Sequence, residues 1–213
     1  MIITSIDVGI IHFGLTMVEI TEEYEFKSIL FCKLIDMTIM RHTLVSKECC
    51  KLHHDNCSAD WITHLIQEHP KPFYNSDIIL IERQPPQGHK DIEQLVTLLF
   101  RDKIKIMSPN SMHAYFGIGQ LDYDQRKEAV ERIVYQRMSK LLRSNKEVND
   151  YIKSLYRRHD LCDAFCIMIH YVEKERKQYK LNNISKDVAK RLRDNNIDLE
   201  SFRYVPKCVN ISN

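Results

Sequence analysis

The sequence predicts an α/β fold in which helices flank a mixed five-stranded sheet. Three apolar, strand-like segments follow one another through short links, at residues 2–8, 13–20 and 25–35, and short links favour antiparallel pairing. Two further strand-like segments, 77–82 and 103–107, each follow a helical segment. Such alternation of helix and strand is typical of parallel pairing. We therefore expect the first, fourth and fifth strands to be parallel, and the first three strands to be antiparallel.

Helical patterns occupy most of the remaining chain. Apolar residues recur at helical spacing within residues 46–68, 90–102, 123–144 and 160–176, which predicts four helices. Residues 108–122 contain one proline and two glycines and are predicted to form a loop.

Length and composition indicate one globular unit with an appendage. The chain has 213 residues, of which 44% are hydrophobic and 28% are charged, as in ordinary soluble domains. We expect a domain over residues 1–176 and a basic extension over 177–213, which either has one helix at 185–194 or is partly disordered. No apolar stretch is long enough to span a membrane, and the N-terminus lacks the basic start of a signal or transit peptide. Seven cysteines without framework spacing favour free thiols in a reducing compartment. We expect an intracellular, cytoplasmic protein.

Charge is distributed unevenly along the chain. The formal net charge is only +2, but residues 1–122 hold 11 Lys/Arg and 16 Asp/Glu, whereas residues 123–213 hold 20 and 13. A basic half suggests an anionic partner such as nucleic acid. Charge alone is equally compatible with a solvated helical surface.

Four acidic residues stand at positions where an acid is unexpected. Asp7 lies inside the apolar first strand, and Glu82 ends the apolar fourth strand. Asp160 and Asp163 are three residues apart and therefore share one face of the last predicted helix. Acids on apolar surfaces are costly unless they are paired or bind a cation. Two of the four have structural alternatives, since Asp160 is favourable near a helix N-terminus and Glu82 has Arg83 as a neighbouring cation.

The four acids together predict a metal centre. If the first and fourth strands are neighbours, Asp7 and Glu82 meet on the sheet, and a helix that crosses it adds Asp160 and Asp163. Carboxylates gathered in this way need cations between them, and oxygen-only ligands select Mg²⁺ or Mn²⁺. Two such ions about 4 Å apart activate water and stabilise the leaving oxygen in phosphodiester cleavage.

Five short motifs resemble those of the ribonuclease H-like Holliday junction resolvases, most closely the poxvirus-type and mitochondrial fungal resolvases related to the bacterial RuvC type. The motifs are Ile-Asp-Val-Gly at 6–9, Ile-Glu-Arg-Gln-Pro at 81–85, Met-Ser-Pro at 107–109, Arg-Lys-Glu-Ala-Val-Glu at 126–131 and Asp-Leu-Cys-Asp-Ala at 160–164. The first motif is weak alone, because sugar-kinase-like ATPases also have it. The second and fifth in this order are much more specific.

This resemblance implies a ribonuclease H-like fold and a homodimer that nicks four-way DNA junctions with Mg²⁺, for which Mn²⁺ would substitute. It implies that the metal ligands are Asp7, Glu82, Asp160 and Asp163. Lys127 matches a family lysine near the scissile phosphate and is expected to stabilise developing charge there.

The expected DNA contacts include three basic residues, Arg83, Arg126 and Lys127. Arg126 replaces the usual first lysine of the family pair, and His12 stands where many relatives have Asn or Lys. Tyr115 and Phe116 are candidates for stacking on unpaired bases at a junction centre, although burial of an aromatic anchor explains them equally well.

Several other features belong to the same set of predictions. The apolar surface of helix 90–102 exceeds what one sheet face needs, so part of it is expected to meet a second subunit.

The cysteines and histidines at 49–57 are expected to be ordinary side chains rather than a zinc site, because one helix offers at most three of the four ligands needed. Cys162 and Cys166 are expected to be packed thiols. Basic residues of the extension are candidates for contacts with junction arms. The missing transit peptide favours a large DNA virus over a mitochondrial source.

The sequence leaves three other functions open. One is a less selective structure-specific or RNA/DNA-hybrid nuclease of the same fold. Another is a non-catalytic nucleic-acid-binding protein, against which the four acids argue. The last is a sugar-kinase-like ATPase, for which the chain lacks glycine-rich phosphate loops.

Overall fold

The computed structural model describes residues 1–9, 11–37 and 58–194. Five strands form a single sheet with the spatial order β3-β2-β1-β4-β5. Their bounds are β1 Ile2–Val8, β2 His12–Ile20, β3 Phe26–Asp36, β4 Ile78–Glu82 and β5 Ile104–Met107. β2 pairs antiparallel with β1 and β3, while β4 pairs parallel with β1 and β5. The predicted mixed sheet, with its antiparallel first three strands, is therefore confirmed.

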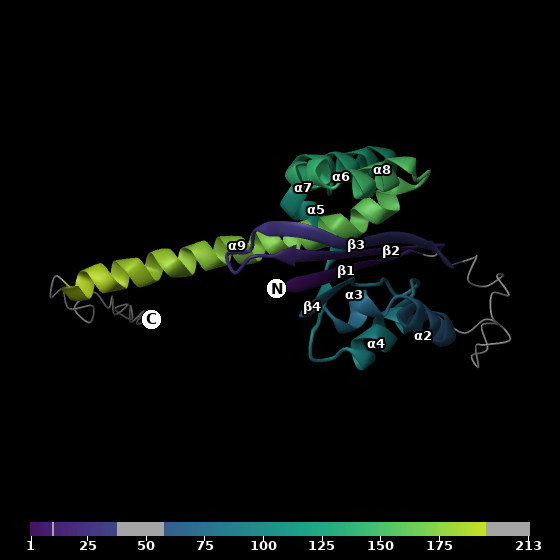
Figure 1. Ribbon diagram of the computed structural model, residues 1–213, viewed down its shortest axis with the longest axis horizontal. Coiled ribbons are helices and arrows are strands. Elements are labelled where there is room, and N and C mark those ends of the chain that lie inside the picture. Colours follow the sequence, from purple (N-terminus) through teal and green to yellow (C-terminus); the bar gives the residue numbers. More distant parts are fainter. Residues whose placement is uncertain (10, 38–57, 195–213) are drawn as a thin grey trace, which may run out of the picture.

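Helices cover both faces of the sheet (Figure 1). On one face lie α2 (Ser58–Glu68), α3 (Pro70–Tyr74) and α4 (Lys90–Leu99). The opposite face is covered by the remaining helices, which are α5 (Pro109–Phe116), α6 (Tyr123–Arg137), α7 (Ser139–Ser144), α8 (Lys146–Ser154) and α9 (Arg158–Asp194). Each face has its own apolar core, and strand alternation divides the side chains between them. Ile79 and Ile81 face the α2–α4 core, whereas Leu80 faces the α9 core.

Several predicted helix boundaries are wrong. The expected loop at 108–122 contains α5, which begins with Pro109 in the first turn and ends at Gly117, whose φ of 68° is left-handed. Proline suits a first helical turn and glycine suits a left-handed cap, so these residues delimit a helix here. The predicted helix 123–144 is two helices, because Met138 has a non-helical backbone (φ −101°, ψ 12°). The helix at 90–102 stops earlier, at Leu99.

Other differences concern segments for which no helix was expected. α8 occupies a stretch for which the sequence analysis made no prediction, and α3 begins at Pro70 immediately after α2. Only the part of predicted helix 46–68 from Ser58 onward is described, and it is helical. The Cys/His cluster at 49–57 lies outside the described residues.

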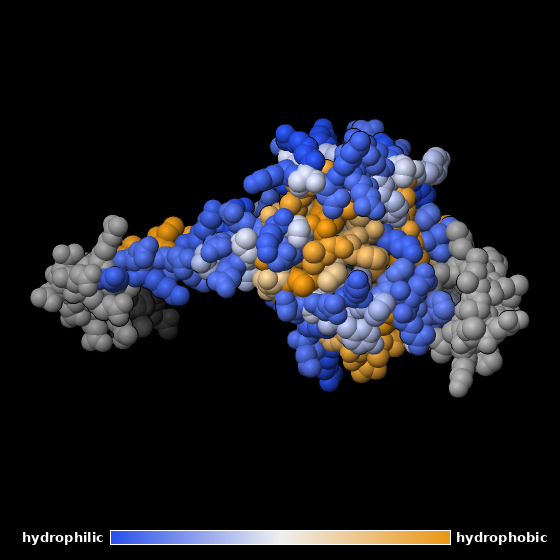
Figure 2. All heavy atoms as spheres, viewed as in Figure 1, coloured by the Kyte–Doolittle hydropathy of each residue, from blue (hydrophilic) through white to orange (hydrophobic). Residues whose placement is uncertain are grey.

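The last helix is a long element that crosses the sheet and continues beyond it. α9 has 37 residues and runs without a break through the expected boundary at residue 176 to Asp194, so the helix predicted at 185–194 is its last part. Its first half is buried against β1 and β2, and its second half projects away from the body (Figure 1). Figure 2 shows mainly hydrophilic atoms along the projecting half and a hydrophobic group toward its end. No helix among the described residues is long and apolar enough to cross a membrane.

Candidate active site

Asp7 and Glu82 are brought together by the register of two neighbouring strands. Ile6 of β1 pairs with Ile81 of β4 in a parallel ladder. The residues that follow them, Asp7 and Glu82, therefore also lie side by side. Both side chains point to the face that α9 covers, because each is two residues from a neighbour on that face (Ser5 and Leu80). The two predicted strand acids therefore meet at the carboxyl end of the parallel pair.

A glycine on β2 lets the last helix approach these acids. Gly14 pairs with Asp7 across the antiparallel ladder. A Cβ atom at Gly14 would lie 2.8 Å from the Asp160 carbonyl oxygen and 3.3 Å from the Ala164 Cβ. No side chain larger than hydrogen fits there without moving α9. The close contact places Asp160 and Asp163 over the strand ends.

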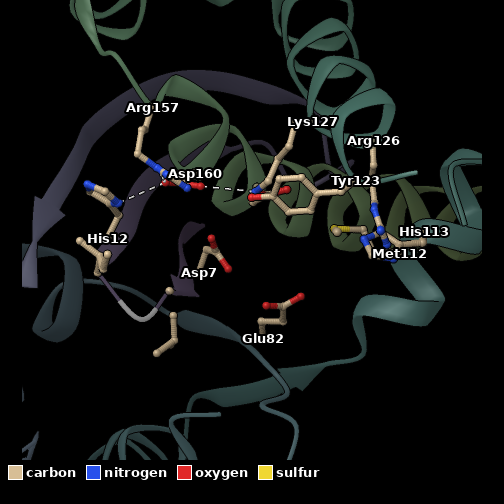
Figure 3. Close-up of a pocket in the computed structure, with 14 residues that line it drawn as sticks. Asp7, His12, Glu82, Met112, His113, Tyr123, Arg126, Lys127, Arg157 and Asp160 are labelled. Carbon is tan, nitrogen blue, oxygen red and sulfur yellow. Dashed lines mark hydrogen bonds and ion pairs between the residues drawn. The ribbon is translucent and has the colours of Figure 1, made fainter. Parts of the chain in front are cut away.

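The four acids line one pocket of about 510 Å³ (Figure 3). Two basic residues, Arg126 and Lys127, enter it from α6, while Arg157 enters from the start of α9. The complete lining is Asp7, Val8, Gly9, Ile11, His12, Glu82, Met112, His113, Tyr123, Arg126, Lys127, Arg157, Asp160 and Asp163. A surface that combines four acids with three bases and two histidines is suited to a polyanion that reacts through a bound cation.

Lys127 contacts both acids of the helix. Its Nζ lies 2.8 Å from Asp163 Oδ2 and 3.4 Å from Asp160 Oδ1, and it also lies 5.4 Å from the centre of the Tyr123 ring. Burial alone would lower the pKa of Lys127, but the adjacent Asp163 and Asp160 charges raise it. The lysine therefore stays positively charged inside the pocket.

Arg157 and two histidines also contact Asp160. The Arg157 Nε donates to Asp160 Oδ2 at 2.7 Å, and His12 Nδ1 lies 3.4 Å from the same oxygen. His159 Nε2 lies 3.2 Å from Oδ1. Burial would raise the pKa of Asp160, but the Arg157 hydrogen bond and the Lys127 charge outweigh it and lower the pKa. Asp160 is therefore ionised and anchored at one end of the pocket.

Burial and neighbouring charges disfavour the ionised forms of the other three acids, Asp7, Glu82 and Asp163. Burial raises the pKa of Asp7 well above its usual value, and the neighbouring Asp163 and Glu82 carboxylates raise it further. Burial also raises the pKa of Glu82, an effect that a hydrogen bond from Asp7 opposes. The pKa of Asp163 is raised by burial despite its contact with Lys127. Crowded acids with raised pKa values are typical of functional sites.

The donor set of the pocket fits a hard divalent cation. Asp7, Glu82 and Asp163 offer only carboxylate oxygens, which suit Mg²⁺ or Mn²⁺ better than zinc, and a cation between them would relieve their mutual repulsion. Within the described part of the chain, no three Asp, Glu, His or Cys side chains are yet arranged to hold a metal ion. In this structure Asp160 and Asp163 contact Lys127, and Asp160 also contacts Arg157.

The end of β4 is fixed just past Glu82. The Arg83 backbone N–H donates to the Met107 carbonyl of β5, and the Gln84 N–H donates to the carboxylate of Glu93 on α4. Glu93 is buried, so α4 supplies an internal acceptor where the ladder stops. Glu82 is consequently the last strand residue before the chain leaves the sheet.

The structure separates the predicted DNA contacts into two groups. Arg126 and Lys127 line the pocket, whereas Arg83 is exposed and lies outside the lining. Tyr115 and Phe116 also lie outside it. Their rings pack on each other and on His170 of α9, and the Tyr115 hydroxyl donates to Glu173. The roles in DNA binding predicted for Arg83, Tyr115 and Phe116 stay predictions.

Several pocket residues carried no recognisable signal in the sequence. His113 comes from α5, which was expected to be a loop, Tyr123 is the first residue of α6, and Arg157 immediately precedes α9. The one available signal was position, since Arg157 lies three residues before Asp160 and can reach it across one helical turn. Cys162 and Cys166 are fully buried free thiols, as expected.

This sheet order, with acids on β1, β4 and the last helix, defines the class: the chain has the fold of ribonuclease H-like, RuvC-type resolvases. The family model described as "Poxvirus A22 protein" matches residues 1–175. The chain belongs to this poxvirus family.

Three solved structures share the fold. The fowlpox virus resolvase in complex with Holliday junction DNA has a TM-score of 0.58 and 17% identity, covering 82% of this chain and 98% of its own. The yeast mitochondrial Holliday junction resolvase has a TM-score of 0.57 and 16% identity, with coverages of 87% and 85%. Thermus thermophilus RuvC has a TM-score of 0.52 and 14% identity, with coverages of 84% and 98%. No curated protein sequence matches the chain.

Proposed function

We propose that this protein is a metal-dependent endonuclease that resolves four-way DNA junctions by paired phosphodiester cleavage. One observation carries the proposal: Asp7, Glu82, Asp160 and Asp163 line one pocket together with Lys127, Arg126 and Arg157. Acids that hold cations and bases that hold phosphates are what metal-dependent cleavage of a nucleic-acid backbone requires. The fowlpox relative, which was solved with a Holliday junction, favours the junction as substrate.

The acids are assigned to the metal and the bases to the DNA. Asp7, Glu82, Asp160 and Asp163 would hold Mg²⁺, or Mn²⁺ in its place. When bound, the metal supplies an activated water and charge stabilisation at the scissile phosphate. Lys127 is already charged beside Asp163 and is placed to stabilise charge that develops on the phosphate oxygens. Arg126 and Arg157, at opposite ends of the pocket (Figure 3), would position the backbone on either side of the cut.

A homodimer would allow the two symmetric cuts that resolution requires, because each subunit would supply one catalytic pocket. The exposed leucines of α4, Leu98 and Leu99, are our candidates for the subunit contact. Figure 2 shows a hydrophobic patch where Figure 1 places α4.

The division into a nuclease domain at 1–176 and a basic extension at 177–213 also remains our proposal. Lys180, Lys186 and Lys190 are exposed on the projecting half of α9, where they would contact phosphates of the junction arms. We place the activity inside the infected host cell, in its reducing cytoplasm, because the family is poxviral and Cys32, Cys162 and Cys166 are free thiols.

The substitution Glu82→Gln tests the site directly. It removes one charged ligand oxygen with little change of shape, so Mg²⁺-dependent junction cleavage should fall by more than about 100-fold. Even changes to residues that only support metal ligands cost about 10- to 100-fold. Junction binding, measured by gel shift in EDTA, should be unchanged.

The matched control is Glu22→Gln, an exposed glutamate in the turn between β2 and β3, which should cleave like the wild type. Full nicking activity in Glu82→Gln would overturn the assignment of the site.

A further inference from the structure

A second pocket adjoins the catalytic pocket at its Arg126 end. This adjoining pocket has a volume of about 460 Å³, and its lining includes Asn110, His113, Gly117, Gly119, Gln120 and Arg126. His113 and Arg126 line both pockets, so the two pockets are neighbours that share these two side chains. A volume of this size is within the range of about 300–1,000 Å³ that is usual for small-ligand sites.

Local sequence leaves one wall of this pocket without side chains. Gly117 caps α5 in the left-handed region (φ 68°), and a Cβ atom there would have no neighbour within 4 Å. A Cβ atom at Gly119 would meet only the His113 Cβ, at 3.8 Å. Ile118 between them is buried and anchors the turn. The glycines therefore leave open space beside the backbone.

Asn110 and Gln120 line this pocket and are exposed to solvent. No hydrogen bond or ion pair joins the side chains of Asn110, Gln120 or Arg126 to another described residue. Arg126 thus presents a free cation at the boundary of the two pockets, and two amide groups follow it. Arg126 extends from α6 toward His113 at the edge of the catalytic pocket (Figure 3).

We propose that the adjoining pocket binds the nucleotide next to the scissile phosphate of the cleaved strand. Arg126 would contact a backbone phosphate at the boundary, and Asn110 and Gln120 would hydrogen-bond to the base. Amide side chains match the edges of bases, adenine best, and unpaired bases at a junction centre have those edges available. The inference rests on the proposed function. If it holds, the protein will cut preferentially where a particular base occupies this pocket.

The first test detects occupancy without cleavage. Full-length wild-type protein is bound in EDTA to four-way junctions that carry a single 4-thiothymine at each central position in turn. After irradiation, cross-linked peptides are identified by mass spectrometry. Cross-links to residues 110–120 from one position of a strand are expected. The absence of such cross-links from every position would overturn the pocket assignment, whether or not the protein cleaves.

The second test measures base preference. Cut positions are sequenced for junctions that differ at the nucleotides flanking the cut, with wild-type protein and Asn110→Ala/Gln120→Ala. The wild type should favour adenine at one flanking position by about fivefold or more, since one good amide–base pair discriminates at least that much. The double variant should lose this preference while it still cleaves.

The matched control is Gln136→Ala/Asn149→Ala, which removes two amides from α6 and α8, outside both pockets. It should keep the wild-type preference. A wild type without preference, or a preference that survives in Asn110→Ala/Gln120→Ala, would overturn the inference. A wild type that cleaves no junction would overturn the proposed nuclease instead, and the cross-links would still decide whether the pocket is used.

Discussion

At the scale of single residues, the site works against the stability of the metal-free protein. Asp7, Glu82 and Asp163 have raised pKa values because burial and mutual repulsion disfavour their charged forms. A structure built only for stability would replace them with neutral groups. Their presence together, beside a lysine that remains charged, is therefore best explained by a cation and a phosphate that bind during function.

Removal of the Asp7 charge should stabilise the metal-free protein. In EDTA at pH 7, Asp7→Asn is expected to raise Tm by about 2–4 °C, equivalent to about 1 kcal/mol for a chain of this size. Because the pKa of Asp7 is raised in the folded state, its ionisation destabilises the fold above that pKa and no longer does so below the unfolded value near 4. The gain in Tm should therefore shrink as pH falls from 7 towards 4.

Thermal unfolding monitored by circular dichroism gives this comparison. Asp150→Asn, on exposed α8 surface, is the control and should leave Tm unchanged. A lower Tm for Asp7→Asn than for the wild type at pH 7 would mean that the Asp7 charge does not destabilise the fold. A gain in Tm that grows towards acidic pH would mean the same.

At the scale of elements, the sheet was predictable and the helix boundaries were less so. Period-two patterns and short links identify strands well, and the acids at 7 and 82 could be placed together because both lie near the carboxyl ends of neighbouring parallel strands. Pro109 and Gly117 were read as loop signals, although the same residues also begin and end helices. Whether they do so depends on tertiary packing, here the burial of Met112 and Ile118 against the α9 core.

The bases of the pocket were harder to predict than its acids. An acid in an apolar strand is conspicuous, whereas a single histidine in α5 and an arginine just before α9 are common in any sequence. Their place in the site follows from how α5 and α9 pack, which local sequence does not reveal. Lys127 and Arg126 were found through a motif resemblance rather than through spacing.

The close approach of α9 to β2 should depend on Gly14. Gly14→Ala would place a Cβ 2.8 Å from the Asp160 carbonyl oxygen, so α9 must shift or the strand must bend. Overpacking of this kind costs about 1–3 kcal/mol, and the shift would displace Asp160 and Asp163 from the strand acids. We expect a lower Tm and junction cleavage reduced by at least about tenfold.

Gly119→Ala is the stability control, because its Cβ would meet only ordinary contacts, and its Tm should stay at the wild-type value. A Gly14→Ala protein with wild-type Tm and cleavage would show that the helix is not positioned by this contact.

At the scale of the whole molecule, paired cuts by the catalytic pocket of Asp7, Glu82, Asp160 and Asp163 require two chains. α4 lies on the face of the sheet opposite α9 (Figure 1), and its Leu98 and Leu99 are 70% and 51% exposed. Adjacent exposed leucines on an otherwise packed helix are typical of a protein contact. The predicted dimer would use this surface while the catalytic pocket stays open to DNA.

Charges on α4 should therefore separate the subunits. Leu98→Lys/Leu99→Lys is expected to change the mass measured by light scattering after gel filtration from dimer to monomer. The folded monomer should keep its Tm within a few degrees, since both side chains are already exposed. Leu30→Lys on β3, which is 46% exposed, is the control and should remain dimeric. A double variant that stays dimeric would exclude α4 as the contact.

The most direct test of the central claim compares substrates under one set of conditions. Wild-type protein with Mg²⁺ is given a four-way junction, a linear duplex, a flap and an RNA/DNA hybrid of matched sequence, and initial rates are measured by denaturing gel. We predict paired, symmetric cuts in the four-way junction, at a rate at least about 100-fold above the others, and no cleavage in EDTA. Equal rates on all four substrates would contradict junction resolution, and cleavage that persists in EDTA would contradict the metal centre.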